Sequence, residues 1–157
     1  MDQTLDSLQR VLLVLNQQYG LNLALDERGR CAFVDEQGVQ FQIQQNGAES
    51  MVITAEVGQV PSADATKLLD MLQFNAAVAS EGMNLALAQD AQTLVLLRTL
   101  GKDTMGQDSP DTWLVPFIER ARWVKDTLRK DVSLAGSVAQ MPGGTTGAMN
   151  YSLMKWG

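Results

Sequence analysis

Apolar side chains recur every three or four residues in three stretches of the chain, which is the spacing of one face of an α-helix. The predicted helices cover residues 4–19, 62–80 and 109–128. The middle helix is apolar over more than one stripe, so we expect it to pack on two surfaces, one of them in another subunit. In the third helix Pro116 cannot donate to the carbonyl four residues back, which predicts a kink or a later start there.

Between these helices, apolar and polar residues alternate with the period of two that indicates β-strands. The pattern predicts strands at residues 31–34, 39–44, 51–57, 83–88 and 93–100. Asn46-Gly47 predicts a hairpin between the second and third strands. The last strand is almost continuously apolar, which indicates burial on both faces. The order α-β-β-β-α-β-β-α predicts an α+β fold, with an antiparallel sheet flanked by helices.

The periodicity fades at Gly136, where the composition becomes that of a linker. We therefore expect one domain at residues 1–135 and a flexible Gly-rich tail at residues 136–157. The end of the tail carries large apolar side chains, at Met149, Tyr151, Met154 and Trp156. The tail is expected to be mobile, and the alternative is that these side chains dock on a neighbour.

The chain is acidic, with 18 Asp and Glu against 12 Lys and Arg, a formal net charge of -6 in 157 residues. This balance argues against nucleic acid or an anionic membrane as the main partner, because both select for Lys and Arg. No apolar run approaches the roughly 20 residues that span a bilayer, so no membrane insertion is expected. The opening Met-Asp-Gln-Thr-Leu-Asp does not have the pattern of a secretory signal peptide.

The residues that usually carry catalysis are scarce. There is no histidine, which removes the commonest general base and metal ligand. The single cysteine, Cys31, falls in a predicted strand, where it is more often a small core residue than a nucleophile. The acidic pairs Asp26-Glu27 and Asp35-Glu36 fit solvated turns better than a calcium site, because neither belongs to an EF-hand loop. We therefore predict no enzymatic activity and no cofactor.

Local sequence adds to the order of elements. The segments concerned are Tyr19-Gly20-Leu21, Leu25-Asp26-Glu27-Arg28-Gly29-Arg30-Cys31, Val57-Gly58-Gln59-Val60-Pro61, Leu68-Leu69-Asp70-Met71-Leu72-Gln73-Phe74-Asn75 and Ala121-Arg122-Trp123. With these segments in this order, the chain resembles the class I type III secretion chaperones, the Tir chaperone family, from about Leu5 to Leu128. Pro116 and the long Gly-rich tail depart from the usual pattern of that family.

The resemblance implies a homodimer in the bacterial cytoplasm that is not an enzyme and uses no cofactor. Such a chaperone binds the N-terminal segment of a type III secreted effector in extended form and keeps the effector competent for secretion. It then aids delivery to the secretion apparatus, whose components are further expected partners. The alternative is a small α+β regulatory or adaptor domain that binds a folded protein.

An extended client can add to a sheet edge through main-chain hydrogen bonds while its alternate side chains fill apolar pockets. The expected effector-binding residues come from the first helix and the first strands: Leu8, Leu12, Leu15, Phe33, Val39, Phe41 and Ile43. The alternative for each of them is a place in the core. The expected dimer interface joins the second helix to the fourth strand, through Leu68, Leu69, Leu72, Leu85 and Leu87.

Overall fold

The computed structural model describes residues 3–47, 50–60, 64–101, 103–104 and 109–142. Its elements are α1 (Gln3–Tyr19), β1 (Arg30–Val34), β2 (Gln40–Gln45), β3 (Ser50–Gln59), α2 (Ala65–Ala77), the 3₁₀ helix η1 (Ala79–Glu81), β4 (Met83–Leu87), β5 (Thr93–Gly101), α4 (Pro110–Arg129) and the 3₁₀ helix η2 (Ala135–Gln140). The predicted α+β fold and the order of its main elements are confirmed.

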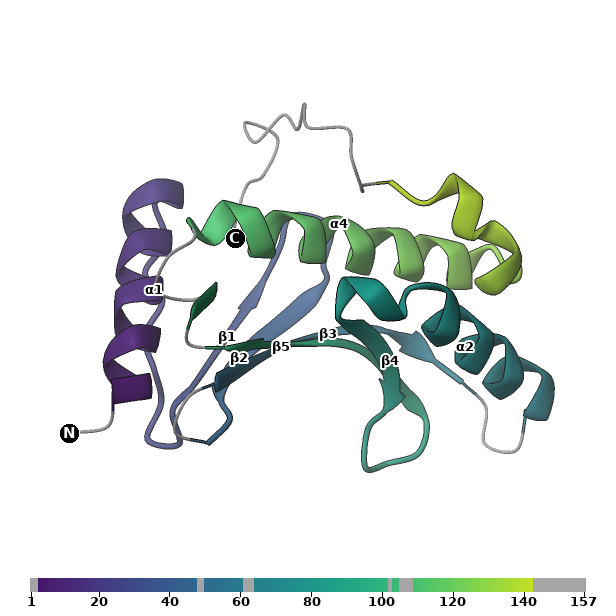
Figure 1. The fold of residues 1–157 in the computed structure, drawn as a ribbon, viewed down its shortest axis with the longest axis horizontal. Coiled ribbons are helices and arrows are strands. Elements are labelled where there is room, and N and C mark those ends of the chain that lie inside the picture. Colours follow the sequence, from purple (N-terminus) through teal and green to yellow (C-terminus); the bar gives the residue numbers. More distant parts are fainter. Residues whose placement is uncertain (1–2, 48–49, 61–63, 102, 105–108, 143–157) are drawn as a thin grey trace.

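The five strands form one antiparallel sheet in the order β1-β2-β3-β5-β4, so β1 and β4 are its edges. Helices α1, α2 and α4 all lie on the same side of this sheet (Figure 1). Within the part of the chain that the structure describes, nothing covers the opposite side, which we call the open face. The molecule therefore has two layers.

The core lies between the helices and the inner side of the sheet. Phe33 and Phe41 stack there with their ring centroids 5.3 Å apart, and Phe117 of α4 meets Phe41 edge-on. The alternation in each strand explains this arrangement, because it sends every second side chain into the same layer. Aromatic packing between Phe41 and Phe117 is therefore one of the contacts that join the sheet to α4.

The prediction that the last strand is buried on both faces is wrong for the described chain. Leu94 and Leu96 of β5 point into the core and are fully buried, whereas Val95 and Leu97 point to the open face and are partly exposed. From the sequence alone, a continuously apolar strand predicts burial on both faces of the sheet. Here the second layer that would bury Val95 and Leu97 is missing from the described residues.

The second and third predicted helices also differ in detail. Helix α2 begins later than expected, because the Asp64 side chain caps it by accepting the Lys67 main-chain N–H at 3.1 Å. It ends at Ala77 and passes through η1 to Gly82, whose positive φ of 72° suits glycine. Helix α4 runs from Pro110 to Arg129 without interruption and contains Pro116, so the predicted later start is wrong.

The chain beyond residue 135 begins with a short helix that the sequence pattern did not predict. Helix η2 packs against α2, and Val138 of η2 and Met141 just after it lie against the core. Asp70 of α2 accepts hydrogen bonds from the Ser133 hydroxyl at 2.7 Å and the Leu134 main-chain N–H at 2.8 Å. The boundary between residues 135 and 136 stays a prediction, and residues 143–157 lie outside the described chain.

One buried charge joins α4 to the segment between α2 and β4. Arg120 is 4% exposed and donates through Nη2 to the Glu81 carboxylate. Its Nε and Nη1 atoms have no hydrogen-bond partner among the described residues. A buried cation with a single counterion depends strongly on that counterion, because burial without it leaves the charge uncompensated.

Replacing Glu81 with Ala should therefore lower the free energy of unfolding by about 1–3 kcal/mol, a buried-pair penalty reduced because Glu81 itself is partly exposed. Arg120→Met removes both the charge and its need for a partner, and should cost less. Urea denaturation of the two variants and the wild type measures the difference. An Arg120→Met variant less stable than Glu81→Ala would contradict this account.

Candidate functional site

The edge strand β1 has main-chain groups available for a further strand. The Asp35 N–H donates to the Val39 carbonyl, and the Gln45 N–H donates to the Gly29 carbonyl. In an antiparallel pair every second residue bonds its neighbour, so residues 31 and 33, like residues 29 and 35, direct their main-chain groups toward β2. The main-chain groups of Ala32 and Val34 therefore point outward, away from β2. None of the main-chain hydrogen bonds among the described residues involves the outward groups of these two residues. We call Ala32 and Val34 the open edge.

The open edge is bounded at the start of β1 by Asp26. Its Oδ1 accepts the Arg30 main-chain N–H at 2.9 Å, and its own N–H donates to the Arg30 carbonyl at 2.8 Å. The hydrogen bond from the Arg30 main chain, with those from Arg28 and the Arg30 side chain, lowers the pKa of Asp26. The carboxylate therefore stays ionised at neutral pH and keeps the outward groups of Arg30 occupied.

The opposite edge, β4, is closed at its centre by an asparagine. The Asn75 side chain of α2 donates to the Leu85 carbonyl at 2.9 Å and accepts the Leu85 N–H at 2.7 Å. A strand added to β4 would have to displace this amide, which already satisfies both groups. Covering an edge in this way is a common protection against unwanted strand pairing. The outward main-chain groups of β4 are thus interrupted at its centre, whereas those of β1 are blocked only at its first residue, Arg30.

A shallow hollow of about 250 Å³ lies on the open face beside the open edge. It is lined by Ala32, Phe33, Val34, Gln40, Phe41, Gln42, Thr54, Glu56 and Val95. Most of these residues are apolar or uncharged, and Glu56 brings the single charged side chain. Such a lining suits an apolar side chain with a polar main chain beside it better than it suits an ionic ligand.

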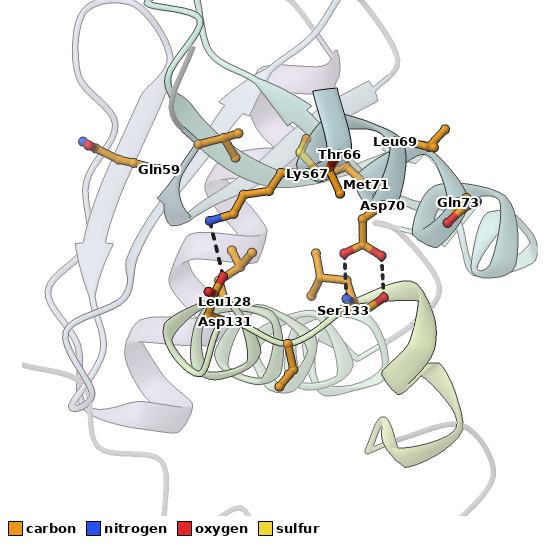
Figure 2. Close-up of a pocket in the computed structure, with 13 residues that line it drawn as sticks. Gln59, Thr66, Lys67, Leu69, Asp70, Met71, Gln73, Leu128, Asp131 and Ser133 are labelled. Atoms are coloured by element: carbon orange, nitrogen blue, oxygen red, sulfur yellow. Dashed lines mark hydrogen bonds and ion pairs between the residues drawn. The ribbon is translucent and has the colours of Figure 1, made fainter. Parts of the chain in front are cut away.

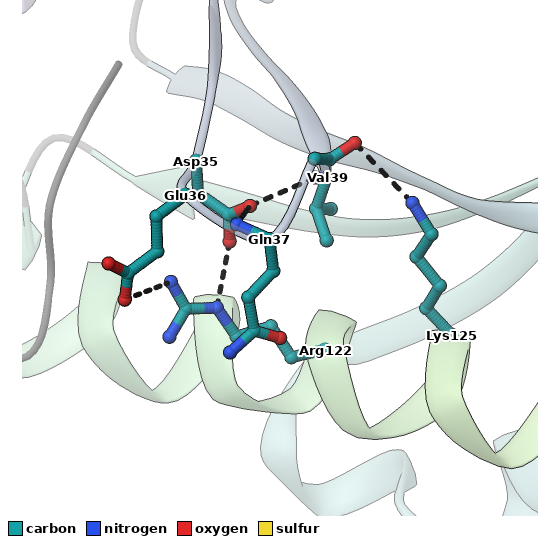
Figure 3. Close-up of polar contacts among 7 residues, drawn as sticks. Asp35, Glu36, Gln37, Val39, Arg122 and Lys125 are labelled. Atoms are coloured by element: carbon teal, nitrogen blue, oxygen red, sulfur yellow. Dashed lines mark hydrogen bonds and ion pairs between the residues drawn. The ribbon is translucent and has the colours of Figure 1, made fainter.

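The turn after β1 is locked to helix α4 by a buried carboxylate (Figure 3). Oδ1 of Asp35 accepts the main-chain N–H groups of Gln37 and Val39, each at 2.9 Å. Oδ2 of Asp35 accepts from Nε of Arg122 at 2.7 Å, and Glu36 lies 3.9 Å from the same guanidinium. Because the turn directly follows the open edge, this lock holds β1 in place on the core.

The second exposed surface is a stripe on α2, formed by Leu69, Leu72 and Ala76. Leu69 is 57% exposed and Leu72 is 65% exposed, although both are large and apolar. The spacing of three and four residues places all three side chains on one side of the helix. Leu87, at the end of β4, is also exposed at 36%. We call the three helical residues the α2 stripe.

The predicted dimer residues divide between this surface and the core. Leu69, Leu72 and Leu87 are exposed, whereas Leu85 is buried and Leu68 packs against the core. The predicted effector-binding residues all lie in the core of the single chain: Leu8, Leu12, Leu15, Phe33, Val39, Phe41 and Ile43. Phe33 and Phe41 also line the hollow on the open face. The roles assigned to both groups stay predictions.

Sequence reasoning did not single out Ala32 and Val34 of the open edge or Asn75, which closes the other edge. The first two function through main-chain groups, which a pattern of side chains cannot display. Asn75 is a polar residue on the apolar side of a predicted helix, and its position was the available signal. A side-chain amide that is partly withdrawn from water needs hydrogen-bond partners, and here they are the main-chain groups of Leu85.

Catalytic and metal-binding chemistry finds little support in the described residues. No group of three or more Cys, Asp or Glu side chains there could hold a metal ion. Burial raises the pKa of the Cys31 thiol, which disfavours the reactive thiolate. None of the helices described is both long and apolar enough to cross a membrane. The geometry is that of a module that binds protein, with one open strand edge and separate apolar surfaces.

This class of module can be assigned to a family. The chain belongs to the Tir chaperone protein (CesT) family, whose model matches residues 10–122, and the resemblance stated from the sequence is confirmed. The members of this family are type III secretion chaperones. The sequence matches none of the curated proteins with which it was compared.

Solved structures show the same fold at low sequence identity. A chain in the crystal structure of the ExsC–ExsE complex gives a TM-score of 0.70 at 17% identity, covering 82% of this chain and 97% of that chain. A chain of the HopA1–SchA chaperone–effector complex gives 0.64 at 12% identity, covering 80% and 98%. The type III secretion chaperone SycH of Yersinia pestis, solved with a fragment of YscM2, gives 0.58 at 18% identity, covering 78% and 98%.

The Asp35 lock can be tested directly. Asp35→Ala should lower the free energy of unfolding by about 2–4 kcal/mol, because it leaves Arg122 and two main-chain N–H groups without their acceptor. Glu36→Ala is the matched control and should change it by less than about 0.5 kcal/mol, since that carboxylate is partly exposed and 3.9 Å from the guanidinium. Chemical denaturation gives both values, and equal effects would argue against the lock.

Proposed function

We propose that this protein is a non-enzymatic chaperone of the bacterial cytoplasm that binds the N-terminal segment of a type III secreted effector in extended form. It keeps that effector competent for secretion and aids its delivery to the secretion apparatus. The observation that carries the proposal is where each sheet edge is blocked: β1 keeps Ala32 and Val34 open in succession, whereas Asn75 blocks β4 at its central residue, Leu85.

The open edge explains how one surface can hold an extended chain. A client strand beside β1 would exchange main-chain hydrogen bonds with Ala32 and Val34. Its side chains would alternate, as in any strand, so that every second one lies over the hollow on the open face. Main-chain bonds would supply affinity that depends little on client sequence, and the hollow would select apolar side chains at alternate positions.

The membership of the chaperone family and the partners of similar structures support this reading. SchA is a chaperone solved in complex with the effector HopA1, and SycH was solved with a fragment of YscM2. These are properties of those proteins, and the likeness to them at 12% and 18% identity concerns the fold. For the present chain the proposal rests on the family and on the open edge together.

We also propose that two copies associate through the α2 stripe. Leu69, Leu72 and Ala76 form an apolar surface on one helix, and Leu87 of β4 is a further exposed apolar residue. Exposed apolar surface of this kind marks an interaction site when it is contiguous. A twofold axis near the middle of the helix would bring the same residues of both copies together. The open edge lies at the other end of the sheet and would stay free in such a dimer.

Client binding should depend on the main-chain N–H of Ala32. In Ala32→Pro the outward donor is lost without disturbing the ladder with β2, because proline is tolerated at an edge position that faces solvent. Ala32→Val keeps the donor and is the matched control. We expect the proline variant to bind about tenfold more weakly, since one unpaired main-chain group costs about 1–2 kcal/mol.

The probe for this measurement is an N-terminal fragment of a client recovered by pull-down from the native bacterium, and calorimetry gives its affinity. The heat-capacity change of binding should be negative, because apolar area is buried. Equal affinities for the Ala32→Pro and Ala32→Val variants would contradict binding at the open edge. A partner that binds only as a folded globule would instead support the adaptor function.

Leu72→Asp should convert a dimer to a monomer that remains folded. Leu72 is 65% exposed in the single chain, so the new carboxylate is solvated in the monomer but would be buried in the dimer. The control is Leu13→Asp, a similarly exposed leucine on α1. Light scattering gives the mass and circular dichroism the fold. A wild-type protein that scatters as a 17.1 kDa monomer at micromolar concentration would refute the dimer.

A further inference from the structure

A pocket with no assigned role lies between α2 and the end of α4, away from the open edge (Figure 2). Its volume is about 400 Å³, within the range of pockets that hold a small ligand or a large side chain. The lining combines six apolar side chains with polar ones from β3, from α2 and from the turn after α4: Gln59, Val60, Thr66, Lys67, Leu69, Asp70, Met71, Gln73, Leu128, Asp131, Val132, Ser133 and Leu134.

Two polar contacts hold the walls of this pocket together. Nζ of Lys67 on α2 lies 3.4 Å from Oδ1 of Asp131, just beyond the end of α4. Asp70, also on α2, accepts the hydroxyl of Ser133 and the main-chain N–H of Leu134. Figure 2 shows these two contacts side by side, joining α2 to the turn that leads into η2. The walls of the pocket are thus held in place by side-chain contacts between separate elements of the fold.

The rim of the pocket exposes apolar side chains to solvent. Val132 is 49% exposed and Leu69 is 57% exposed. An occupant with apolar side chains would cover both, whereas an ionic ligand would find no free cation there, since Lys67 is paired with Asp131. The chemistry of the pocket therefore selects an apolar, side-chain-sized group.

We infer that the occupant is the C-terminal segment of the same chain, residues 149–156. The described chain ends at Pro142, just after η2, and η2 begins at the pocket wall formed by Ser133 and Leu134. The segment Met-Asn-Tyr-Ser-Leu-Met-Lys-Trp carries five large apolar side chains in eight residues. This inference does not depend on the proposed binding of an effector.

The chain that follows η2 is long enough to bring residues 149–156 back to the pocket. Six residues of 3₁₀ helix advance about 12 Å, so the chain must return by that amount from the end of η2 to the pocket. Residues 141–147, Met-Pro-Gly-Gly-Thr-Thr-Gly, have a Gly-rich composition for which the mean end-to-end distance is about 15 Å. A ligand tethered this closely has an effective concentration in the millimolar range, which a second molecule in solution would not reach.

Trypsin offers a direct test in the full-length protein, because Lys155 is the only Lys or Arg after Lys130. Cleavage there releases Trp156 and Gly157, and intact-mass spectrometry follows the loss. Docking should slow this cleavage at least tenfold relative to a synthetic peptide of residues 143–157. Val132→Asp places a charge on the rim of the pocket and should restore fast cleavage. Leu13→Asp, which alters an exposed leucine of α1, should leave the protection unchanged.

Two results would overturn the inference. One is cleavage of the wild-type chain as fast as that of the free peptide, and the other is protection that persists in Val132→Asp. Protection that disappears on dilution would assign the segment to a pocket in a second copy and would refute the intramolecular contact. Because no client takes part in the experiment, its outcome is independent of the result with Ala32→Pro.

Discussion

An edge strand cannot satisfy its own outward main-chain groups, and the arrangement of this molecule follows from how each edge meets that constraint. At β4 the amide of Asn75 supplies one donor and one acceptor to Leu85. At β1 Asp26 does the same for Arg30, the first residue of the strand, and so leaves Ala32 and Val34 open in succession. An open edge is a hazard for aggregation unless it is short, and two residues are few enough to remain safe without a partner. The same shortness means that main-chain bonds alone give little affinity, so a client would also have to use the hollow and other apolar surface.

Side chains that bind main-chain groups recur throughout the fold and hold the segments that the pattern of apolar residues leaves undefined. Asn16 of α1 accepts the Leu23 N–H at 2.7 Å and donates to the Leu23 carbonyl at 3.0 Å, which repeats the contact of Asn75 with Leu85. Asp35 and Asp70 likewise accept hydrogen bonds from main-chain N–H groups in the turns after β1 and α4. Each of these groups is partly or fully removed from water, where an unpaired partner would be costly. A small domain with one apolar layer can thus position its loops through side chains that bind main-chain groups.

The sequence predicted the elements and their order because helix and strand periods are local properties of the side chains. It could not predict which strands form the edges, since the pairing of β3 with β5 joins residues more than 30 positions apart. For that reason Ala32 and Val34 went unnoticed, while Phe33 and Phe41, which look more suited to binding, turned out to lie in the core. Helix η2 was missed because it is held by Asp70 from another element, not by its own periodicity. The broad apolar surface of α2 was anticipated correctly, since Leu69 and Leu72 exceed what one buried stripe requires.

The exposed apolar residues are unevenly distributed, and their distribution distinguishes the two ends of the molecule. Leu69, Leu72 and Val132 gather around α2 and the end of α4, whereas the edge at β1 offers main-chain groups and a hollow with a mixed lining. Apolar area is the better driver of a lasting contact between identical copies, because burying it gains free energy without the need to match polar groups. Main-chain groups suit a partner that must be released, because water can replace each hydrogen bond at little net cost. In a protein that holds a client temporarily, the proposed dimer contact through Leu72 and Ala76 would be the lasting one and the proposed client contact at β1 the reversible one.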